Sequence, residues 1–196
     1  MANVKGSALG WFKRHVETRH GERGVARWLE GLDAGQSELI RGGLILPNIW
    51  YPVSTWNHLV ERYVLTLGGG AWSSFGPVAY DIADKDLNAF FKVLLKQSSP
   101  PMILRRASSL WERYFDAGKM EAEERSSNHF VVRLSAPTAE GRAPGPITCA
   151  QGVPVWQRRA LELTGAKDVR SAHVKCRFHG AAACEFDVTW PESTKR

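Results

Sequence analysis

The sequence lacks any stretch that would cross a membrane or be led across one. No window approaches eighteen consecutive apolar residues, and the first residues, MANVKGSALGW, contain no apolar run as long as that of a signal peptide. Internal repeats are absent too, as is any linker long enough to divide the chain. From these absences we expect a cytoplasmic protein with no membrane span and a single domain over residues 1–196.

Catalytic motifs are also missing. There is no GxSxG elbow, Walker loop, HExxH pair or dinucleotide-binding fingerprint. The glycine run at 68–70 could cradle a phosphate if a strand preceded it and a Lys-Ser/Thr pair followed it. Neither is present, so this run is predicted to end a helix. Acidic pairs such as Glu123-Glu124 belong to a charged surface, and we expect no enzymatic activity.

Positive charge is in excess but is not concentrated. The chain carries 26 Lys and Arg residues against 20 Asp and Glu residues, which gives a net charge of +6. Acidic residues interleave with the basic ones, and basic doublets such as those at 105–106 and 158–159 are isolated. A nucleic-acid-binding surface would instead gather its lysines and arginines on one face. We therefore expect no nucleic-acid partner.

The sequence does contain a helical first part, about 1–118, and a strand-rich second part, 119–190, followed by a short tail at 191–196. Helical spacing and helix-ending glycines or prolines predict helices at 7–19, 24–32, 54–67, 71–83, 87–95 and 102–117. Ser54 or Thr55 is the expected N-cap of the third helix, and Pro47 and Pro52 predict a turn around Trp50-Tyr51.

The second part predicts two hairpins separated by a helix. Alternating apolar residues indicate strands at 119–126 and 129–135, and again at 171–178 and 183–190, with a helix at 153–163 between the hairpins. Helices segregated from an antiparallel sheet make an α+β domain. We expect N-terminal helices packed on a small antiparallel sheet, with the C-terminal hairpin tied by a metal site.

Cysteine is scarce, and its three copies lie in the last fifty residues. With one histidine they form the pattern Cys149-x23-His173-x2-Cys176-x7-Cys184. Three thiols and an imidazole are the ligand count of a tetrahedral structural zinc site, and the hairpin would bring the last three together. Buried thiols that bind no metal would explain the same residues. A disulfide would leave one cysteine unpaired.

From Cys149 to Trp190 the sequence resembles the C-terminal part of the 4-vinyl reductase domain, which occurs alone and as the sensor of aromatic-responsive bacterial activators. Those sensors bind zinc through three cysteines and a carboxylate shortly before the second one. Cys149, Cys176 and Cys184 match the cysteine positions, and His173 stands where the family usually has glutamate. The resemblance covers the last quarter of the chain and implies a structural zinc. A weaker resemblance, at residues 46–52, is to uncharacterised myxobacterial paralogues.

The resembled domain is similar in fold to the haem nitric-oxide sensors and to small subunits of the vesicle-tethering TRAPP complex. Those nitric-oxide sensors use an axial histidine on a helix and a Tyr-x-Ser-x-Arg clamp for the propionates. This sequence has no such clamp, and His58, on the helix at 54–67, is the only axial candidate. We therefore expect zinc as the cofactor and no haem.

One expected function is sensing of a hydrophobic or aromatic small molecule. The chain has eight tryptophans and eight phenylalanines, and the resembled domains enclose an apolar pocket. We expect a pocket of about 300 Å³ or more where the helix at 102–117 meets the first hairpin, lined by Trp111, Phe115, His129 and Phe130. Core packing would explain those four residues equally well.

The alternative function is a homodimeric interaction or tethering module without a ligand. Trp50, Tyr51 and Trp56 could form an exposed aromatic patch, and the related tethering subunits dimerise through helices. No output domain is expected on this chain, so either function would act through a protein partner. We expect a homodimer joined mainly by the helical half.

Overall fold

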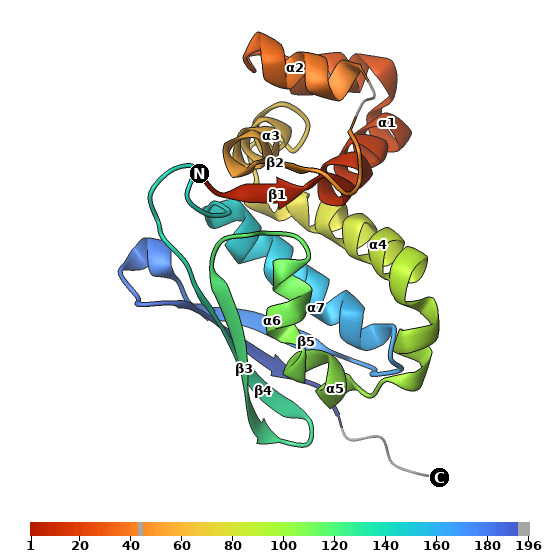
Figure 1. The fold of residues 1–196 in the computed structure, drawn as a ribbon, viewed down its shortest axis with the longest axis vertical. Coiled ribbons are helices and arrows are strands. Elements are labelled where there is room, and N and C mark those ends of the chain that lie inside the picture. Colours follow the sequence, from red (N-terminus) through yellow and green to blue (C-terminus); the bar gives the residue numbers. More distant parts are fainter. Residues whose placement is uncertain (43–44, 192–196) are drawn as a thin grey trace.

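The chain folds into a layer of helices and an antiparallel sheet, as expected for an α+β protein (Figure 1). The computed structural model describes residues 1–42 and 45–191; of 89–97 it describes only the helical backbone. The α-helices are α1 (Gly6–Leu29), α2 (Ala34–Arg41), α3 (Val53–Thr66), α4 (Phe75–Gln97), α5 (Pro100–Arg105), α6 (Ala107–Glu112) and α7 (Val153–Glu162). The strands are β1 (Asn3–Lys5), β2 (Trp50–Pro52), β3 (Lys119–Ser126), β4 (His129–Ser135), β5 (Arg170–Lys175) and β6 (Cys184–Thr189).

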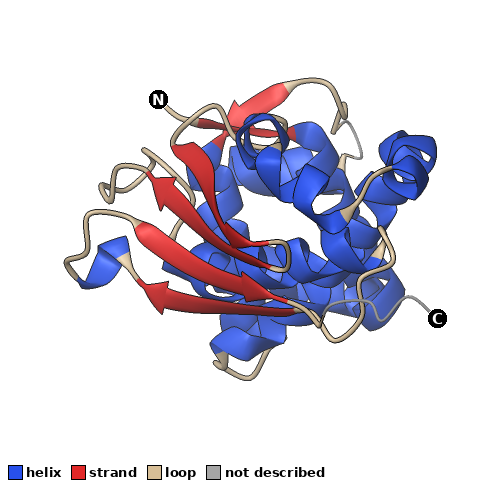
Figure 2. Cartoon of the chain, turned by 90° about the horizontal axis from the view of Figure 1, so that it is seen from below, coloured by secondary structure: helices blue, strands red, loops and turns tan. Residues whose placement is uncertain are grey.

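The main sheet joins the two predicted hairpins edge to edge. Its strand order is β3-β4-β6-β5, with every neighbouring pair antiparallel. The first hairpin lies at its predicted position. In the second, the strand predicted at 171–178 ends at Lys175 and is followed by a 3-10 turn at Arg177–His179, while the other strand ends lie within one residue of the prediction. Figure 2 shows the four strands at one side of the molecule, with most of the helices at the other. Because α5 and α6 contact β3 and α7 contacts β5, the helices cover one face of this sheet.

The two faces of the sheet differ sharply in polarity, because successive residues of a strand point to opposite sides. The helix-covered inner face is fully buried and contains Phe130, Val132, Leu134, Cys184, Phe186 and Val188. The outer face carries ion pairs, in which Arg133 bridges Glu123 at 2.7 Å and Glu185 at 3.2 Å. His129 belongs to this outer face and lies 2.6 Å from Asp187 Oδ1.

The helical half packs around the aromatic side chain of Phe12, which contacts the rings of Trp28, Trp56, Tyr63 and Phe75. The predicted stop after residue 19 is present as a kink in α1. Gly21 there has φ 63°, a conformation that glycine adopts without the strain a side chain would cause. The short strands β1 and β2 pair with each other in this half of the molecule. A turn was predicted around Trp50-Tyr51, but both residues belong to strand β2.

Three predicted helix boundaries are wrong, and tertiary contacts explain the first of them. A break was expected after residue 83, yet α4 runs through Asp84–Asp86, because Asp84 pairs with Arg159 at 2.6 Å and Asp86 is buried beside Tyr114. The helix expected at 102–117 divides at Arg106, whose φ of −99° and ψ of 15° end α5. α3 begins at Val53 after Pro52 and has no side-chain cap, so Ser54 and Thr55 are not its N-cap.

Within the described residues, no helix has both the length and the apolar character that crossing a membrane requires. This agrees with the expectation of no membrane-spanning helix.

Candidate metal cluster and adjoining apolar cavity

A β-bulge puts two of the predicted ligands on the same face of β5. His173 and Cys176 are three positions apart, so a regular strand would point them to opposite faces. The pairing of β5 with β6 shifts between His173 and Lys175, which leaves Val174 as an extra residue. His173 therefore faces inward with its partner Phe186, their rings stacked 4.8 Å apart, and Cys176 returns to the same inner side.

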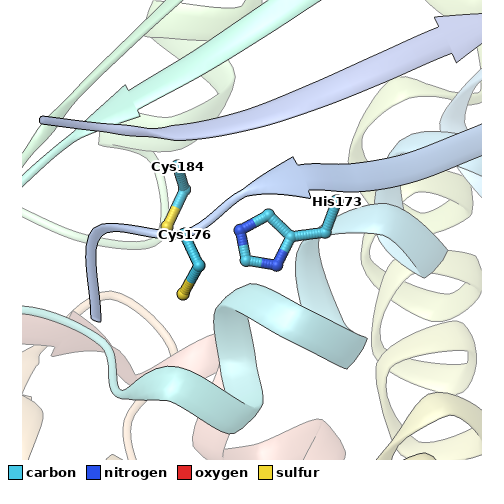
Figure 3. Close-up of side chains that lie close together, drawn as sticks. All are labelled: His173, Cys176 and Cys184. Atoms are coloured by element: carbon cyan, nitrogen blue, oxygen red, sulfur yellow. The ribbon is translucent and has the colours of Figure 1, made fainter. Parts of the chain in front are cut away.

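His173, Cys176 and Cys184 come together at the end of this hairpin, and their candidate ligand atoms all lie within 4.8 Å of one another. Figure 3 shows the imidazole turned toward the two cysteine side chains. His173 Nε2 is buried and has no hydrogen-bond partner among the described residues. Donor atoms around a tetrahedral zinc lie roughly 3.5–4 Å apart. A contraction of about 1 Å would therefore fit these three atoms to a metal ion.

Cys149 lies next to this cluster rather than within it. It sits in a π-helical turn, η2 (Thr148–Gly152), immediately before α7. The guanidinium of Arg177 joins it to the hairpin: Nη1 donates to Cys149 Sγ at 2.9 Å and to Cys184 Sγ at 3.4 Å. The structure thus brings three of the four predicted ligands together, and the fourth, Cys149, contacts Cys184 both directly and through Arg177.

Arg177 places a buried positive charge beside the cysteine sulfurs. The side chain is 4% exposed, and Nη2 donates to the Pro144 carbonyl at 2.6 Å. Within the described part of the chain, no carboxylate forms an ion pair with it, so the sulfur atoms are its only candidates for counter-charge. A buried guanidinium without an anion would be strongly unfavourable. The arrangement therefore calls for negative charge on sulfur.

The pKa values of the two buried cysteines move in opposite directions. The hydrogen bond from the Cys149 thiol, followed by a hydrogen bond from the His173 side chain and then by the backbone N–H and positive charge of Arg177, lowers the pKa of Cys184 to about 3 against the opposing effect of burial. The same thiol–thiolate hydrogen bond, reinforced by burial, raises the pKa of Cys149. One proton is thus shared by a pair whose Cys184 sulfur is the anion. Thiolate is the form of cysteine that binds metals.

An apolar cavity of about 80 Å³ lies on the other side of η2. It is enclosed by α4, α5, α6, α7 and η2, and Thr148 and Gly152 line it while their neighbour Cys149 faces the sulfur cluster. Its wall is Ala8, Trp56, Phe75, Ala79, Ile82, Ile103, Leu104, Ala107, Leu110, Trp111, Tyr114, Phe115, Met120, Thr148, Gly152, Val153, Trp156, Gln157 and Ala160.

The cavity contains two of the four predicted lining residues. Trp111 and Phe115 line it, but His129 is on the outer face of the sheet and Phe130 packs in the core against Trp190. The prediction was wrong for both because adjacent strand residues point to opposite faces, and the cavity meets the first hairpin only at Met120. Its volume is also smaller than the expected 300 Å³ or more.

Other sequence-based assignments also change. Trp56 is 4% exposed and lines the cavity, so it does not belong to an exposed patch with Trp50. His58 contacts Gln36 at 3.1 Å and lies away from the cavity wall. Sequence reasoning missed Arg177, although its position directly after Cys176 was a usable signal. It also missed Gln157, for which periodicity gives no signal.

No family model matches the sequence, and no curated protein matches it. Solved structures do match. An H-NOX protein from S. oneidensis in the Fe(II)NO ligation state is similar with a TM-score of 0.71 at 12% identity, over 96% of this chain and 100% of that one. An Fe(II) unliganded H-NOX protein from K. algicida is similar with a TM-score of 0.67 at 14% identity, over 98% and 100%.

These neighbours overturn the expectation that haem is excluded. They are H-NOX proteins in an Fe(II)NO state and an unliganded Fe(II) state, and two further similar structures concern haem distortion in the H-NOX family and the modulation of haem redox potential by porphyrin distortion. The described wall of the cavity contains Met120 and Tyr114, residue types that ligate haem iron elsewhere, but no histidine and no cationic side chain. Tyr114 donates its proton to Asp86 at 2.6 Å. This wall does not fit a haem held by an axial histidine and an arginine clamp.

Each similarity is far below the identity at which function could be transferred, so the comparisons speak to architecture. Over nearly its whole length, this chain has a fold similar to that of H-NOX proteins.

Proposed function

We propose that this chain is a non-enzymatic sensor domain that binds a small apolar molecule in its interior cavity and carries a structural zinc beside it. The signal would pass to a protein partner. The observation that carries the proposal is the cavity itself, which lies between the helices and whose described wall consists almost entirely of apolar side chains. Protein interiors are otherwise close-packed, with few voids larger than a water molecule.

The wall of the cavity has the chemistry of a ligand site rather than of a water site. A buried water needs two to four polar partners. Here three tryptophans, Trp56, Trp111 and Trp156, contribute large apolar surfaces, and polar groups are few. An apolar cavity of this kind stays dry and takes up apolar ligands.

A zinc ion would be held by His173, Cys176 and Cys184, with Cys149 as the proposed fourth ligand. The orphaned Nε2 of His173 and the thiolate at Cys184 support this assignment. Three thiolates and a neutral imidazole around Zn²⁺ carry a net charge of −1, and Arg177 would bring the buried unit to zero. A site closed by four protein ligands has no open position for water, which supports a structural role.

The remaining parts of the proposal follow from the same residues. Cys149 and Cys184 are fully buried, which argues against a nucleophile that meets a substrate. Unpaired thiolate ligands need a reducing compartment, which supports action in the cytoplasm. We propose no nucleic-acid partner, since the basic residues alternate with acidic ones.

The test uses the full-length protein purified without chelator. Native mass spectrometry should show one zinc per chain, and 2-methylpropene or a smaller hydrocarbon should quench or shift tryptophan fluorescence and raise the melting temperature. Ala107→Leu, which fills the cavity, should abolish both ligand effects while the protein stays folded. Ala172→Leu, on the exposed β5, is the matched control. Added haemin provides a separate arm, in which a Soret band that Ala107→Leu abolishes would identify a porphyrin as the occupant.

If no hydrocarbon and no porphyrin binds, and Ala107→Leu changes nothing but stability, the cavity is a packing defect. The better function is then the interaction module. Leu46, Ile49 and Trp50 support that second candidate, because they are 58%, 48% and 39% exposed on one short segment before β2. Such a segment could join two copies of the chain or one copy to a partner.

A further inference from the structure

Gln157 is the one buried amide side chain in the wall of the cavity. It projects from α7, is 4% exposed, and has its two polar atoms in different situations. The side-chain carbonyl Oε1 accepts a hydrogen bond from the Ser171 hydroxyl at 2.6 Å. The amide nitrogen Nε2 is buried without a partner among the described residues. Ser171 thus anchors the amide and leaves its N–H groups unsatisfied.

A second donor in the wall is also unsatisfied. The indole N–H of Trp156 lies beside the Tyr114 hydroxyl but does not reach hydrogen-bond geometry with it. The other polar groups are occupied. Tyr114 donates to Asp86 at 2.6 Å, and Thr148 Oγ1 accepts from Trp56 Nε1 at 3.0 Å. Unsatisfied buried donors are rare in folded proteins and each is unfavourable, so two in one wall indicate a missing acceptor.

We propose that the cavity selects a small, uncharged ligand with a carbonyl-type acceptor, and that Gln157 Nε2 donates the hydrogen bond that orients it. This inference rests on the cavity being a ligand site, as proposed above. Charge is disfavoured because the described wall contains no cationic or acidic side chain. A cavity of 150 Å³ takes benzene, so this one of about 80 Å³ would hold roughly three or four non-hydrogen atoms without rearrangement.

The experiment compares a ketone with an alkene of the same shape. Acetone and 2-methylpropene differ only in having oxygen or CH₂ at one position, and binding is followed by tryptophan fluorescence, since three tryptophans line the cavity. The measurement is the change that Gln157→Leu causes in the dissociation constant of each ligand. Comparing these two changes cancels the difference in hydration between the ketone and the alkene. Gln157→Leu should weaken ketone binding about tenfold and leave alkene binding unchanged.

Two further variants sharpen the result. Gln157→Glu keeps the shape but replaces the amide donor, and it should also weaken ketone binding selectively. Gln151→Leu is the matched control, because Gln151 lies one turn away in η2 and does not line the cavity; it should change neither affinity. Alkene binding by each variant reports that the protein is folded and that the cavity is intact.

The outcomes separate this inference from the function on which it rests. If the alkene binds but Gln157→Leu weakens both ligands equally, or neither, the cavity is real and the role of Gln157 is overturned. If propionate binds as well as the ketone, the assignment to uncharged ligands is overturned. If neither the ketone nor the alkene binds to the wild-type protein, the proposed ligand site and this inference are both wrong.

Discussion

Arg177 is the single residue on which the electrostatics of the sulfur cluster depend. Its guanidinium contacts two cysteine sulfurs and a backbone carbonyl, and its Nε has no partner among the described residues. If zinc binds with three thiolates, Arg177 neutralises the remaining charge in a region that water does not reach. Groups that contact metal ligands in this way tune metal affinity, typically by about 10- to 100-fold.

Replacing Arg177 with methionine therefore tests the charge argument. We expect Arg177→Met to lower zinc affinity by about 10- to 100-fold and to reduce the free energy of unfolding by about 3 kcal/mol or more, because a buried anion loses its partner. Competition with a chromogenic chelator gives the affinity, and urea denaturation gives the stability. Arg170→Met, at an exposed position of β5, is the control. Unchanged zinc affinity in Arg177→Met would show that the guanidinium does not balance the metal site.

Cys149 and Cys176 allow a second comparison at the same scale. Cys176 belongs to the group within 4.8 Å, whereas Cys149 lies outside that group and contacts it through Arg177 and through a hydrogen bond to Cys184. We expect both Cys176→Ser and Cys149→Ser to lose zinc below one equivalent per chain, because structural sites need all four ligands and metal binding is coupled to folding. Metal analysis after desalting checks this. Full zinc retention by Cys149→Ser alone would reduce the ligand set to three protein residues.

At the scale of elements, sequence patterns predicted the helices and strands whose formation depends on residues close together in the sequence. Both hairpins and the helix at 153–163 were predicted because alternation and turn residues are properties of the segment itself. α4 continues through Asp84 and Asp86 because Arg159 pairs with Asp84 and the Tyr114 hydroxyl donates a hydrogen bond to Asp86. Both partners lie far away in sequence. The division of the predicted helix at 102–117 and the π-helical turn at Cys149 also depend on packing, for which the sequence offers no periodic signal.

The bulge at Val174 gives an element-scale prediction. The bulge absorbs one residue of the three-position spacing between His173 and Cys176, so deleting Val174 would leave a regular strand in which these two side chains are two positions apart and share a face. We therefore expect the deletion variant to keep one zinc per chain. Val174→Thr keeps the bulge and should also bind one zinc, since position 174 is exposed. Metal analysis and circular dichroism of both proteins provide the measurement, and a folded deletion variant that loses zinc contradicts this account.

At the scale of the whole molecule, the sequence predicted the α+β class and the position of the candidate metal ligands near the C-terminal end. It did not predict how the two hairpins pair with each other. The order β3-β4-β6-β5 places Leu134 opposite Cys184, a pairing between strands about fifty residues apart that no local pattern encodes. Trp111 and Phe115, two of the four residues predicted to line a pocket, line the candidate cavity. Its remaining wall comes from α4, η2 and α7, because the chain must fold before those surfaces meet.

The expected homodimer belongs to this scale, and the structure changes where its interface should lie. The apolar side of α3 is used inside the chain, with Trp56, Leu59, Val60 and Tyr63 at most 5% exposed. It cannot also bind a second copy. The apolar surface that the helical half leaves exposed includes Leu46, Ile49 and Trp50, with Lys5 packed over the Trp50 ring at 4.1 Å.

We therefore predict a dimer through the segment containing Ile49 and Trp50. Sedimentation velocity at micromolar concentration should give twice the chain mass of 21.8 kDa. Ile49→Asp should give the monomer, because burying an unpaired carboxylate at the centre of an interface costs about 2 kcal/mol or more. Met102→Asp places the same charge on an exposed apolar residue of α5 and should leave the dimer intact. If Leu65→Asp dissociates the dimer and Ile49→Asp does not, the interface lies on the outer side of α3 instead. If the wild-type protein is a monomer at these concentrations, the dimer prediction is wrong, and the interaction would be with a different protein.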